Sequence, residues 1–271
     1  MWSKIEQVTE RSEISHPAIR AALELENLDE VEIHHIGDLP ARSGLGSSSS
    51  FSVGILNALR SYRGIETSKK ELAKSAIKLE REILKEAGGI QDQIAAAYGG
   101  LNYVQIEKTG NFNVQPITLS TEKTSELENS LLLVFTGIFR NSSDLAEMQI
   151  KNIPKSTSRL EEMGEIVLEA RQAFTSVDFI KCLGNLLNET WHLKKHLNSS
   201  VSNSLIDDIY TSAINAGAYG GKLLGAGAGG FMVFVMPEEA KSNVEKVLAS
   251  FVQVPIRLDQ KGAIIQRSDF K

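Results

Sequence analysis

The stretch that decides the fold reads Pro40-Ala41-Arg42-Ser43-Gly44-Leu45-Gly46-Ser47-Ser48-Ser49-Ser50. It lies between an alternating, strand-like run and an apolar, helix-like run. Gly44 and Gly46 can adopt positive φ and let backbone N–H groups approach a ligand closely. The four serines that follow supply hydroxyls at a helix start, where N–H groups are unpaired and the helix dipole is positive. The sequence therefore predicts a phosphate-binding loop.

The alternative for the same stretch is an ordinary strand-to-helix turn, in which the serines only cap and the glycines only bend. The stretch does not match either of the two common phosphate-binding sequence motifs. No Gly-Lys-Ser or Gly-Lys-Thr follows, as a Walker loop requires, and the Gly-x-Gly-x-x-Gly spacing of a dinucleotide loop is absent. The prediction of a phosphate site in this stretch therefore needs evidence from other parts of the sequence.

Composition narrows the class of protein. The chain has 271 residues, of which 42% are hydrophobic and 23% charged, as is ordinary for a globular protein. Its net charge of −5 argues against a nucleic-acid partner, because such proteins present basic surfaces. The single cysteine, Cys182, excludes an intrachain disulfide. No run approaches the roughly 18 apolar residues of a membrane span. We expect a cytoplasmic protein with no membrane partner.

The chain around the loop is predicted to be mixed helix and strand. Residues 14–25 have the pattern of an amphipathic helix, and residues 30–36 alternate like a half-buried strand. Ser68, with Glu71 three residues later, begins a capping pattern that opens a long helix to about residue 87. We expect the inner stripe of that helix to contain Leu72, Ala76, Leu79 and Ile83.

Asp92 stands in the break after that helix, in Gly88-Gly89-Ile90-Gln91-Asp92-Gln93, just before a short helix. One interpretation is an N-cap or first-turn acid, the role of most such residues. The other is a carboxylate beside a phosphate site, where it would orient or deprotonate an attacking hydroxyl.

The second half of the chain is predicted to be a separate α+β region, mostly helical up to residue 196. Residues 131–136 have the pattern of a buried strand, and Arg140, just beyond it, is a candidate anion contact. Residues 217–230 form a second glycine-rich stretch before a strand at 231–236. Glycine at this density marks close backbone approach, and we expect a loop that closes over the first. The alternative is a tight bend in a sheet.

Taken together, three stretches resemble the motif pattern of the GHMP small-molecule kinases. Residues 40–50 resemble the central ATP-phosphate motif of that superfamily. Residues 222–231 resemble its C-terminal glycine motif, from which Leu224 and Ala228 depart. Residues 89–93 resemble the segment that holds the catalytic Asp in galactokinase-type members. Glu80 stands twelve residues before Asp92, as the magnesium-binding Glu of the superfamily does.

The resemblance implies ATP and Mg²⁺ as cofactors and Asp92 as the catalytic residue. Ser48 and Glu80 are the implied magnesium ligands, which fits the preference of this ion for a few protein oxygens together with nucleotide phosphates. The residues implied to bind the phosphates of ATP are Pro40, Arg42, Ser43, Gly44, Leu45, Gly46, Ser47, Ser48, Ser49, Gly225, Gly227 and Gly229.

The implied fold is α+β, with two domains: a ribosomal-protein-S5-like N-terminal domain over residues 1–125 and a ferredoxin-like C-terminal domain over residues 126–271. Members of the family begin with a strand-rich, sugar-binding segment, whereas the first residues here resemble the interior of a member. The N-terminal domain is therefore expected to be truncated.

Within the superfamily, residues 37–50, 91–102 and 134–140 are most similar to D-glycero-D-manno-heptose 7-phosphate kinases. This similarity implies transfer of the ATP γ-phosphoryl group to the anomeric hydroxyl of a heptose 7-phosphate. Two alternatives stay open. One is a kinase with another acceptor, such as a galactose-like sugar or mevalonate, and the other is a non-catalytic nucleotide- or sugar-phosphate-binding protein derived from such a kinase.

Overall fold

The structure is a computed structural model that describes residues 5–38, 44–139 and 150–267. Its chain forms two compact units. The first contains the described residues of Met1–Ala41, Gly46–Ile117 and Asp259–Lys271, and the second those of Arg42–Leu45 and Thr118–Leu258. The predicted domain boundary lay between residues 125 and 126. In the structure the change from one unit to the other falls at residues 117 and 118, and the final segment rejoins the first unit.

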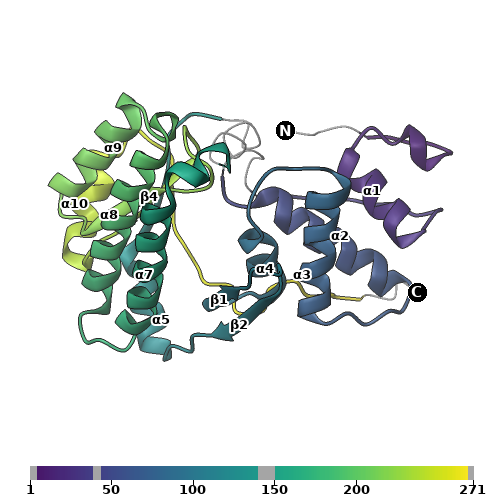
Figure 1. The fold of residues 1–271 in the computed structure, drawn as a ribbon, viewed down its shortest axis with the longest axis horizontal. Coiled ribbons are helices and arrows are strands. Elements are labelled where there is room, and N and C mark those ends of the chain that lie inside the picture. The colour runs from purple at the N-terminus through teal and green to yellow at the C-terminus, as the bar shows by residue number, and fades with distance from the viewer. Residues whose placement is uncertain (1–4, 39–43, 140–149, 268–271) are drawn as a thin grey trace. The chain divides into compact units, whose positions relative to one another are not determined.

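Helices that pack on one another make up most of the first unit (Figure 1). Its elements, in chain order, are η1 (Arg11–Glu13), α1 (Pro17–Glu26), α2 (Ser47–Tyr62), α3 (Lys69–Ile77), η2 (Lys78–Ile83), α4 (Gln91–Tyr98), β1 (Asn102–Ile106) and β2 (Phe112–Pro116). Apolar residues of α1, α2, α3, α4 and β2 form one core cluster. The predicted capping box is present, since Ser68 and Glu71 each accept a hydrogen bond from the backbone of the other.

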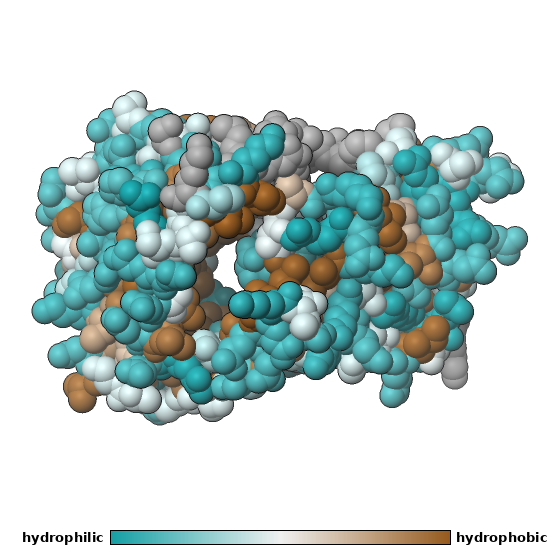
Figure 2. Space-filling model, viewed as in Figure 1, coloured by the Kyte–Doolittle hydropathy of each residue, from teal (hydrophilic) through white to brown (hydrophobic). Residues whose placement is uncertain are grey.

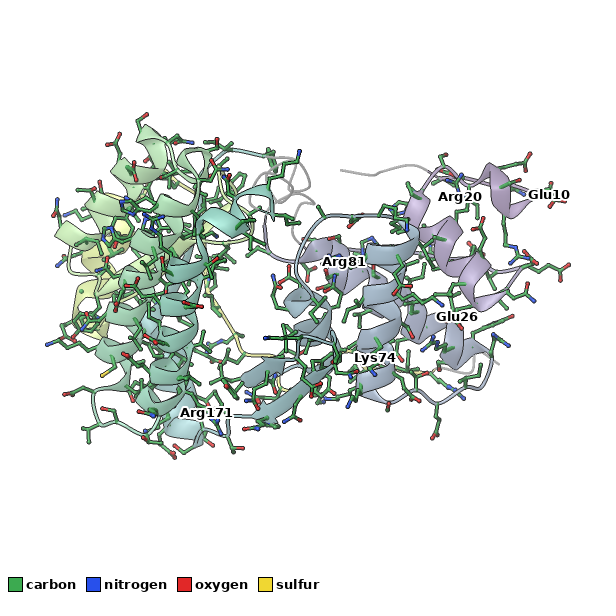
Figure 3. The ribbon with its side chains drawn as sticks, in the orientation of Figure 1. Glu10, Arg20, Glu26, Lys74, Arg81 and Arg171 are labelled. Carbon is green, nitrogen blue, oxygen red and sulfur yellow. The ribbon has the colours of Figure 1, made fainter. Side chains whose placement is uncertain are left out.

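A buried ion pair joins α1 to α2. Glu26, at the end of α1, is 6% exposed and accepts a hydrogen bond from Nε of Arg60 at 2.8 Å (Figure 3). Arg63 donates to the backbone carbonyl of Glu26 at 2.7 Å. Because a buried carboxylate is stable only when it is paired, these contacts fix the end of α1 against α2.

The predicted strand at residues 30–36 is wrong. Side chains alternate there as expected, since Val31 and Ile33 pack against the core and His35 lies edge-on to the ring of Phe51 at 4.8 Å. However, no backbone hydrogen bond joins residues 31–36 to any other described segment. Alternation sets the direction of side chains, but a strand also needs a partner that pairs its N–H and C=O groups.

The predicted long helix changes its geometry part-way. After α3, residues Lys78–Ile83 form η2, a π-helical turn, in which the N–H of Leu84 donates to the carbonyl of Leu79 at 2.9 Å. A π turn adds a residue and rotates the side chains that follow. Leu72, Ala76 and Leu79 are buried as predicted, but Ile83 is 40% exposed, which corrects the predicted stripe. The same turn buries the consecutive residues Leu79 and Glu80.

The second unit is built on a four-stranded antiparallel sheet with the order β4-β5-β3-β6. Its elements are α5 (Thr121–Ser130), β3 (Leu131–Phe135), η3 (Ile153–Lys155), α7 (Thr157–Ala173), α8 (Phe179–Leu197), η4 (Ser199–Val201), α9 (Ser204–Asn215), β4 (Gly220–Leu223), β5 (Phe231–Val235), α10 (Glu238–Val247) and β6 (Gln253–Val254). Strands β3 and β5 match the predicted runs, whereas α5 and β4 were not predicted.

The core of the second unit joins the sheet to its helices. Leu132, Val134, Met232 and Phe234 project from the two central strands into one buried cluster with Trp191 of α8 and residues of α9 and α10. Trp191 is fully buried. The visible face of the molecule is mostly hydrophilic, with scattered apolar patches (Figure 2). Among the described residues, no helix has the length and apolar character that a membrane span requires.

Candidate functional site

The serine run begins α2 with an uncapped N-terminus. Gly46 is the residue before the helix and has φ +69°, which a glycine adopts without strain. No side chain caps this helix end, and the first N–H with a helical partner belongs to Ser50, which donates to the carbonyl of Gly46 at 2.9 Å. The N–H groups of Ser47, Ser48 and Ser49 have no partner among the described residues. The geometry is that of an anion site.

Glu80 lies buried beneath this helix end. It is 4% exposed, and its Oε2 accepts a hydrogen bond from Oγ of Ser49 at 3.0 Å. Nε2 of Gln93, at the start of α4, donates to the same oxygen. The other carboxylate oxygen, Oε1, is buried and has no hydrogen-bond partner among the described residues. An acid with one orphaned buried oxygen is costly unless it serves a ligand.

Glu80 lies within the π-helical turn, where it and the preceding Leu79 are both buried. Arg81, the next residue, turns outward and donates to the carbonyl of Gly88 (Figure 3). This contact ties η2 to the loop that leads into α4. The burial of Glu86 and the charge of Glu80 raise the pKa of the Glu86 carboxyl.

Asp92 lies next to Gly46, the residue before α2. A Cβ built on Gly46 would lie 3.4 Å from Cγ of Asp92, so the carboxyl is packed directly against the helix N-terminus. Asp92 does not cap its own helix: the N-cap of α4 is Ile90, without a side-chain bond. No described residue makes a hydrogen bond or ion pair with its carboxylate. Although the residue keeps solvent access, partial desolvation raises the pKa of its carboxyl. This environment favours a proton acceptor over a structural cap.

The residues present fit a magnesium ion. A hard cation takes oxygen ligands, and Oε1 of Glu80 is a buried oxygen that lacks a partner. The serine hydroxyl that contacts Glu80 is that of Ser49, whereas Ser48, the serine implied by the resemblance, is exposed at the helix start. The described residues contain no cluster of three or more His, Cys, Asp or Glu suited to a metal. A bound ion would therefore need oxygens from a ligand.

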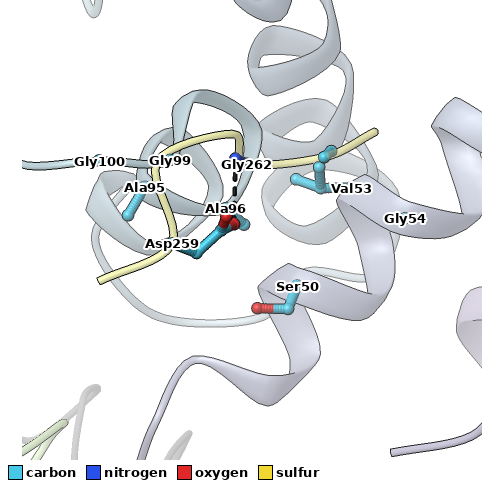
Figure 4. Close-up of a pocket in the computed structure, with 10 residues that line it drawn as sticks. Ser50, Val53, Gly54, Ala95, Ala96, Gly99, Gly100, Asp259 and Gly262 are labelled. Atoms are coloured by element: carbon cyan, nitrogen blue, oxygen red, sulfur yellow. Dashed lines mark hydrogen bonds between the residues drawn. The ribbon is translucent and has the colours of Figure 1, made fainter. Parts of the chain in front are cut away.

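A separate pocket of about 360 Å³ is lined by residues of α2, α4 and residues 259–263. Small residues line it, among them Ser50 and Gly54 of α2 and Ala95 and Ala96 of α4, and the side chain of Asp259 turns back on the N–H of Gly262 (Figure 4). Neither Glu80 nor Asp92 lines this pocket, so it is not the candidate catalytic centre.

In the second unit, the glycine-rich stretch joins β4 to β5 and is held by three other elements. We call residues 224–230 the glycine loop. The N–H of Ala228 donates to the carbonyl of Val201 at 2.8 Å, and Oγ1 of Thr136 donates to the carbonyl of Gly230 at 2.8 Å. Nζ of Lys194, on α8, donates to the carbonyl of Gly225 at 2.6 Å. The loop is fixed in one conformation by these contacts.

Positive φ recurs through the glycine loop. Gly225, Gly227, Ala228 and Gly230 have positive φ, whereas Ala226 and Gly229 do not. Loops with positive-φ residues are among the backbone conformations that can present N–H groups to an anion. All four residues of β4 and the whole of β5 are paired, so the stretch is the loop that joins these two strands and not a bend within a strand.

Ala228 is a non-glycine residue in a left-handed conformation, with φ +62°. We expect Ala228→Gly to raise the free energy of unfolding by about 0.5–1 kcal/mol, because relief of the Cβ strain exceeds the added entropy of the unfolded chain. Gly227→Ala should act in the opposite direction, since a Cβ there would lie 2.9 Å from Cα of Val201. Urea unfolding of both variants measures the difference, and equal stabilities would contradict the strain.

The structure describes most of the predicted site residues. Gly46, Ser47, Ser48, Ser49, Glu80 and Asp92 lie together in the first unit, and Gly225, Gly227 and Gly229 lie in the loop of the second. Gly44 and Leu45 precede Gly46 as a bend in the chain. Pro40, Arg42, Ser43 and Arg140 lie outside the described residues. Sequence reasoning missed Gln93 and Lys194. Gln93 stands beside Asp92, but nothing local indicates that its amide reaches Glu80.

Two protein-family models match the chain, in the same order as the motifs described above. The model of the GHMP kinase N-terminal domain matches residues 14–100, which contain the serine run, Glu80 and Asp92. The model of the GHMP kinase C-terminal domain matches residues 171–253, which contain the glycine loop. The chain belongs to the GHMP kinases. The predicted α+β, two-domain fold of that family is confirmed by solved structures.

Two of the similar proteins act on heptose phosphates by name. The chain is 36% identical over 218 residues to D-glycero-alpha-D-manno-heptose 7-phosphate kinase of Campylobacter jejuni, covering 80% of this chain and 64% of that protein. The structure of a D-glycero-D-manno-heptose 1-phosphate kinase from Bacteroides thetaiotaomicron superposes with a TM-score of 0.69 at 27% identity, covering 91% of this chain and 73% of the other.

Similarity also extends to kinases of other acceptors. Mevalonate kinase of Pyrococcus horikoshii is 28% identical over 262 residues, covering 92% of this chain and 74% of that protein. The chain spans less than two thirds of the length of the Campylobacter kinase.

Proposed function

We propose that this chain carries the phosphate-binding and catalytic residues of an ATP-dependent kinase that phosphorylates the anomeric hydroxyl of D-glycero-D-manno-heptose 7-phosphate. One observation carries the kinase part of the proposal. The unpaired N-terminus of α2, the orphaned carboxylate oxygen of Glu80 and the unbonded carboxylate of Asp92 occur together in the first unit. The heptose acceptor is supported by the names of two relatives.

The phosphate-binding role falls to backbone groups. The N–H groups of Ser47, Ser48 and Ser49 point out of a helix N-terminus and offer donors to the phosphates of ATP. Gly46 leaves no Cβ between this helix end and Asp92. In the second unit, the proposal assigns further contacts with the phosphates to Gly225, Gly227 and Gly229 of the glycine loop.

The acid–base role falls to Asp92. Its carboxylate has no structural partner, and desolvation raises its pKa toward the range in which a carboxylate accepts a proton effectively. We assign it the orientation and deprotonation of the attacking sugar hydroxyl. Glu80 and Ser48 are proposed to hold Mg²⁺, with Ser49 holding Glu80 in place. When bound, Mg²⁺ would neutralise the charge of the phosphates.

Because ATP and sugar phosphates are cytoplasmic metabolites, we expect the enzyme to act in the cytoplasm.

An ATP-consumption assay with three acceptors tests the proposal. Mg-ATP is supplied with heptose 7-phosphate, galactose or mevalonate, and we expect turnover that depends on heptose 7-phosphate. Turnover with galactose or mevalonate alone would keep the kinase and overturn the acceptor. Calorimetric binding of Mg-ATP without turnover on any acceptor would favour the non-catalytic alternative. Absence of Mg-ATP binding would contradict the proposed function at its first step.

A further inference from the structure

We propose that Lys194 is a positioning residue that sets the conformation of the glycine loop for phosphate binding. Nζ of Lys194 donates to two carbonyls, that of Leu223 at 3.2 Å and that of Gly225 at 2.6 Å. One ammonium group therefore joins the last residue of β4 to a residue at the start of the loop. The inference rests on the proposed function, because it assigns the loop a phosphate ligand.

The left-handed conformation of Gly225 explains why the loop needs this contact. Strand β4 ends at Leu223, and Gly225, two residues beyond it, has φ +62°, so the backbone has left the strand and the carbonyl of Gly225 lies outside the ladder. A carbonyl turned away from its ladder requires another donor. Lys194 supplies that donor from α8, and it supplies a charged one, which makes a shorter and stronger bond than a neutral group.

The same contact fixes the direction of the next peptide group. The carbonyl of Gly225 and the N–H of Ala226 belong to one planar peptide and point in opposite directions. With the carbonyl held against α8, the N–H of Ala226 is directed away from that helix. The ammonium also places a positive charge at the loop, in a chain whose net charge is −5. A positive charge at this position favours an anion such as the phosphate of a nucleotide.

A lysine near the C-terminus of a helix often serves only the dipole of its own helix. Lys195 shows the contrast, because it bonds to Asp207 of α9 at 3.2 Å and lies over the rings of Trp191 and Tyr210. Lys194 bonds instead to carbonyls 29 and 31 residues further along the chain. These two bonds tie α8 to the glycine loop and to the end of β4.

Three variants of the full chain test the proposal. Lys194→Met removes the ammonium and keeps the chain length. Lys194→Arg keeps a charged donor. Lys181→Met is the matched control, since Lys181 is an exposed lysine on the same helix. We expect Lys194→Met to weaken Mg-ATP binding about tenfold in calorimetric titration, the factor for loss of one charge-assisted hydrogen bond. Lys194→Arg should recover most of that loss, and Lys181→Met should bind as the unchanged chain does.

Hydrogen exchange of the loop amides gives a readout that needs no ligand. Exchange at residues 224–230 should rise about tenfold in Lys194→Met and stay unchanged in Lys181→Met. Slow exchange that persists in Lys194→Met would overturn the proposal, as would unchanged Mg-ATP affinity in a chain that binds it. Failure of the unchanged chain to bind Mg-ATP would count against the proposed function alone, while the exchange data would still decide whether Lys194 positions the loop.

Discussion

Asp92→Asn is expected to lower phosphoryl transfer by at least about a hundredfold and to leave Mg-ATP affinity within about twofold of the unchanged chain. The reason is that an amide cannot accept the proton of the sugar hydroxyl, while the N–H groups at the start of α2 remain. The substitution changes no hydrogen bond of the described fold, because the carboxylate of Asp92 makes none there. Steady-state rates and calorimetric titration measure the two effects separately.

The pH dependence follows from the raised pKa of Asp92. The carboxylate form acts as the base, so the rate should fall as pH decreases through this raised pKa. The effect on stability has the opposite sign. A carboxyl whose pKa is higher in the folded state than in the unfolded state stabilises the fold at low pH and loses that contribution as pH rises through the folded pKa. Asp92→Asn should therefore be at least as stable as the unchanged chain at neutral pH.

Glu82→Gln is the matched control for this prediction, because Glu82 is an exposed carboxylate in the same unit. Its rate and its affinity for Mg-ATP should both match those of the unchanged chain. If Asp92→Asn kept full activity, the assignment of Asp92 as the base would be wrong. If it lost Mg-ATP binding as well as activity, Asp92 would be acting in the nucleotide site and not on the acceptor.

Glu80→Gln should abolish the stabilisation that Mg²⁺ adds to the ATP-bound chain. The isosteric amide keeps the size of the side chain but removes the anionic oxygen that lacks a partner. For the unchanged chain, Mg²⁺ at about ten times its dissociation constant should add about 1.4 kcal/mol of stability. Thermal unfolding with ATP and EDTA, and then with ATP and Mg²⁺, measures this difference. In EDTA, we expect the variant to be as stable as the unchanged chain or more so, because a buried charge is removed.

The control for the metal prediction is again Glu82→Gln, from the same π-helical turn. It should gain the full stabilisation by Mg²⁺. Equal gains in Glu80→Gln and Glu82→Gln would contradict a metal role for Glu80. Its buried carboxylate would then serve only the hydrogen bonds to Ser49 and Gln93.

The local features of this chain were determined by its sequence alone. The start of α3 at Ser68, the start of α2 at the serine run and the strands around 131–135 and 231–235 were all predicted. Each depends on interactions within a few residues: a capping box, a helix N-terminus and a run of apolar side chains. The order of the kinase-like motifs could also be read from the sequence, because each motif is a short run of consecutive residues.

The tertiary structure decided what depends on distant segments. Residues 30–36 alternate like a strand, yet pairing requires a second segment, and none of the described residues supplies it. The sequence shows Glu80 as an acid at the expected spacing. Its buried hydrogen bonds, however, come from Ser49, 31 residues away, and from Gln93 on another helix. The contact of Lys194 with the glycine loop likewise spans 31 residues. Local sequence encodes backbone preference, whereas burial, pairing and the shared hydrogen bonds of a site exist only after the chain has packed.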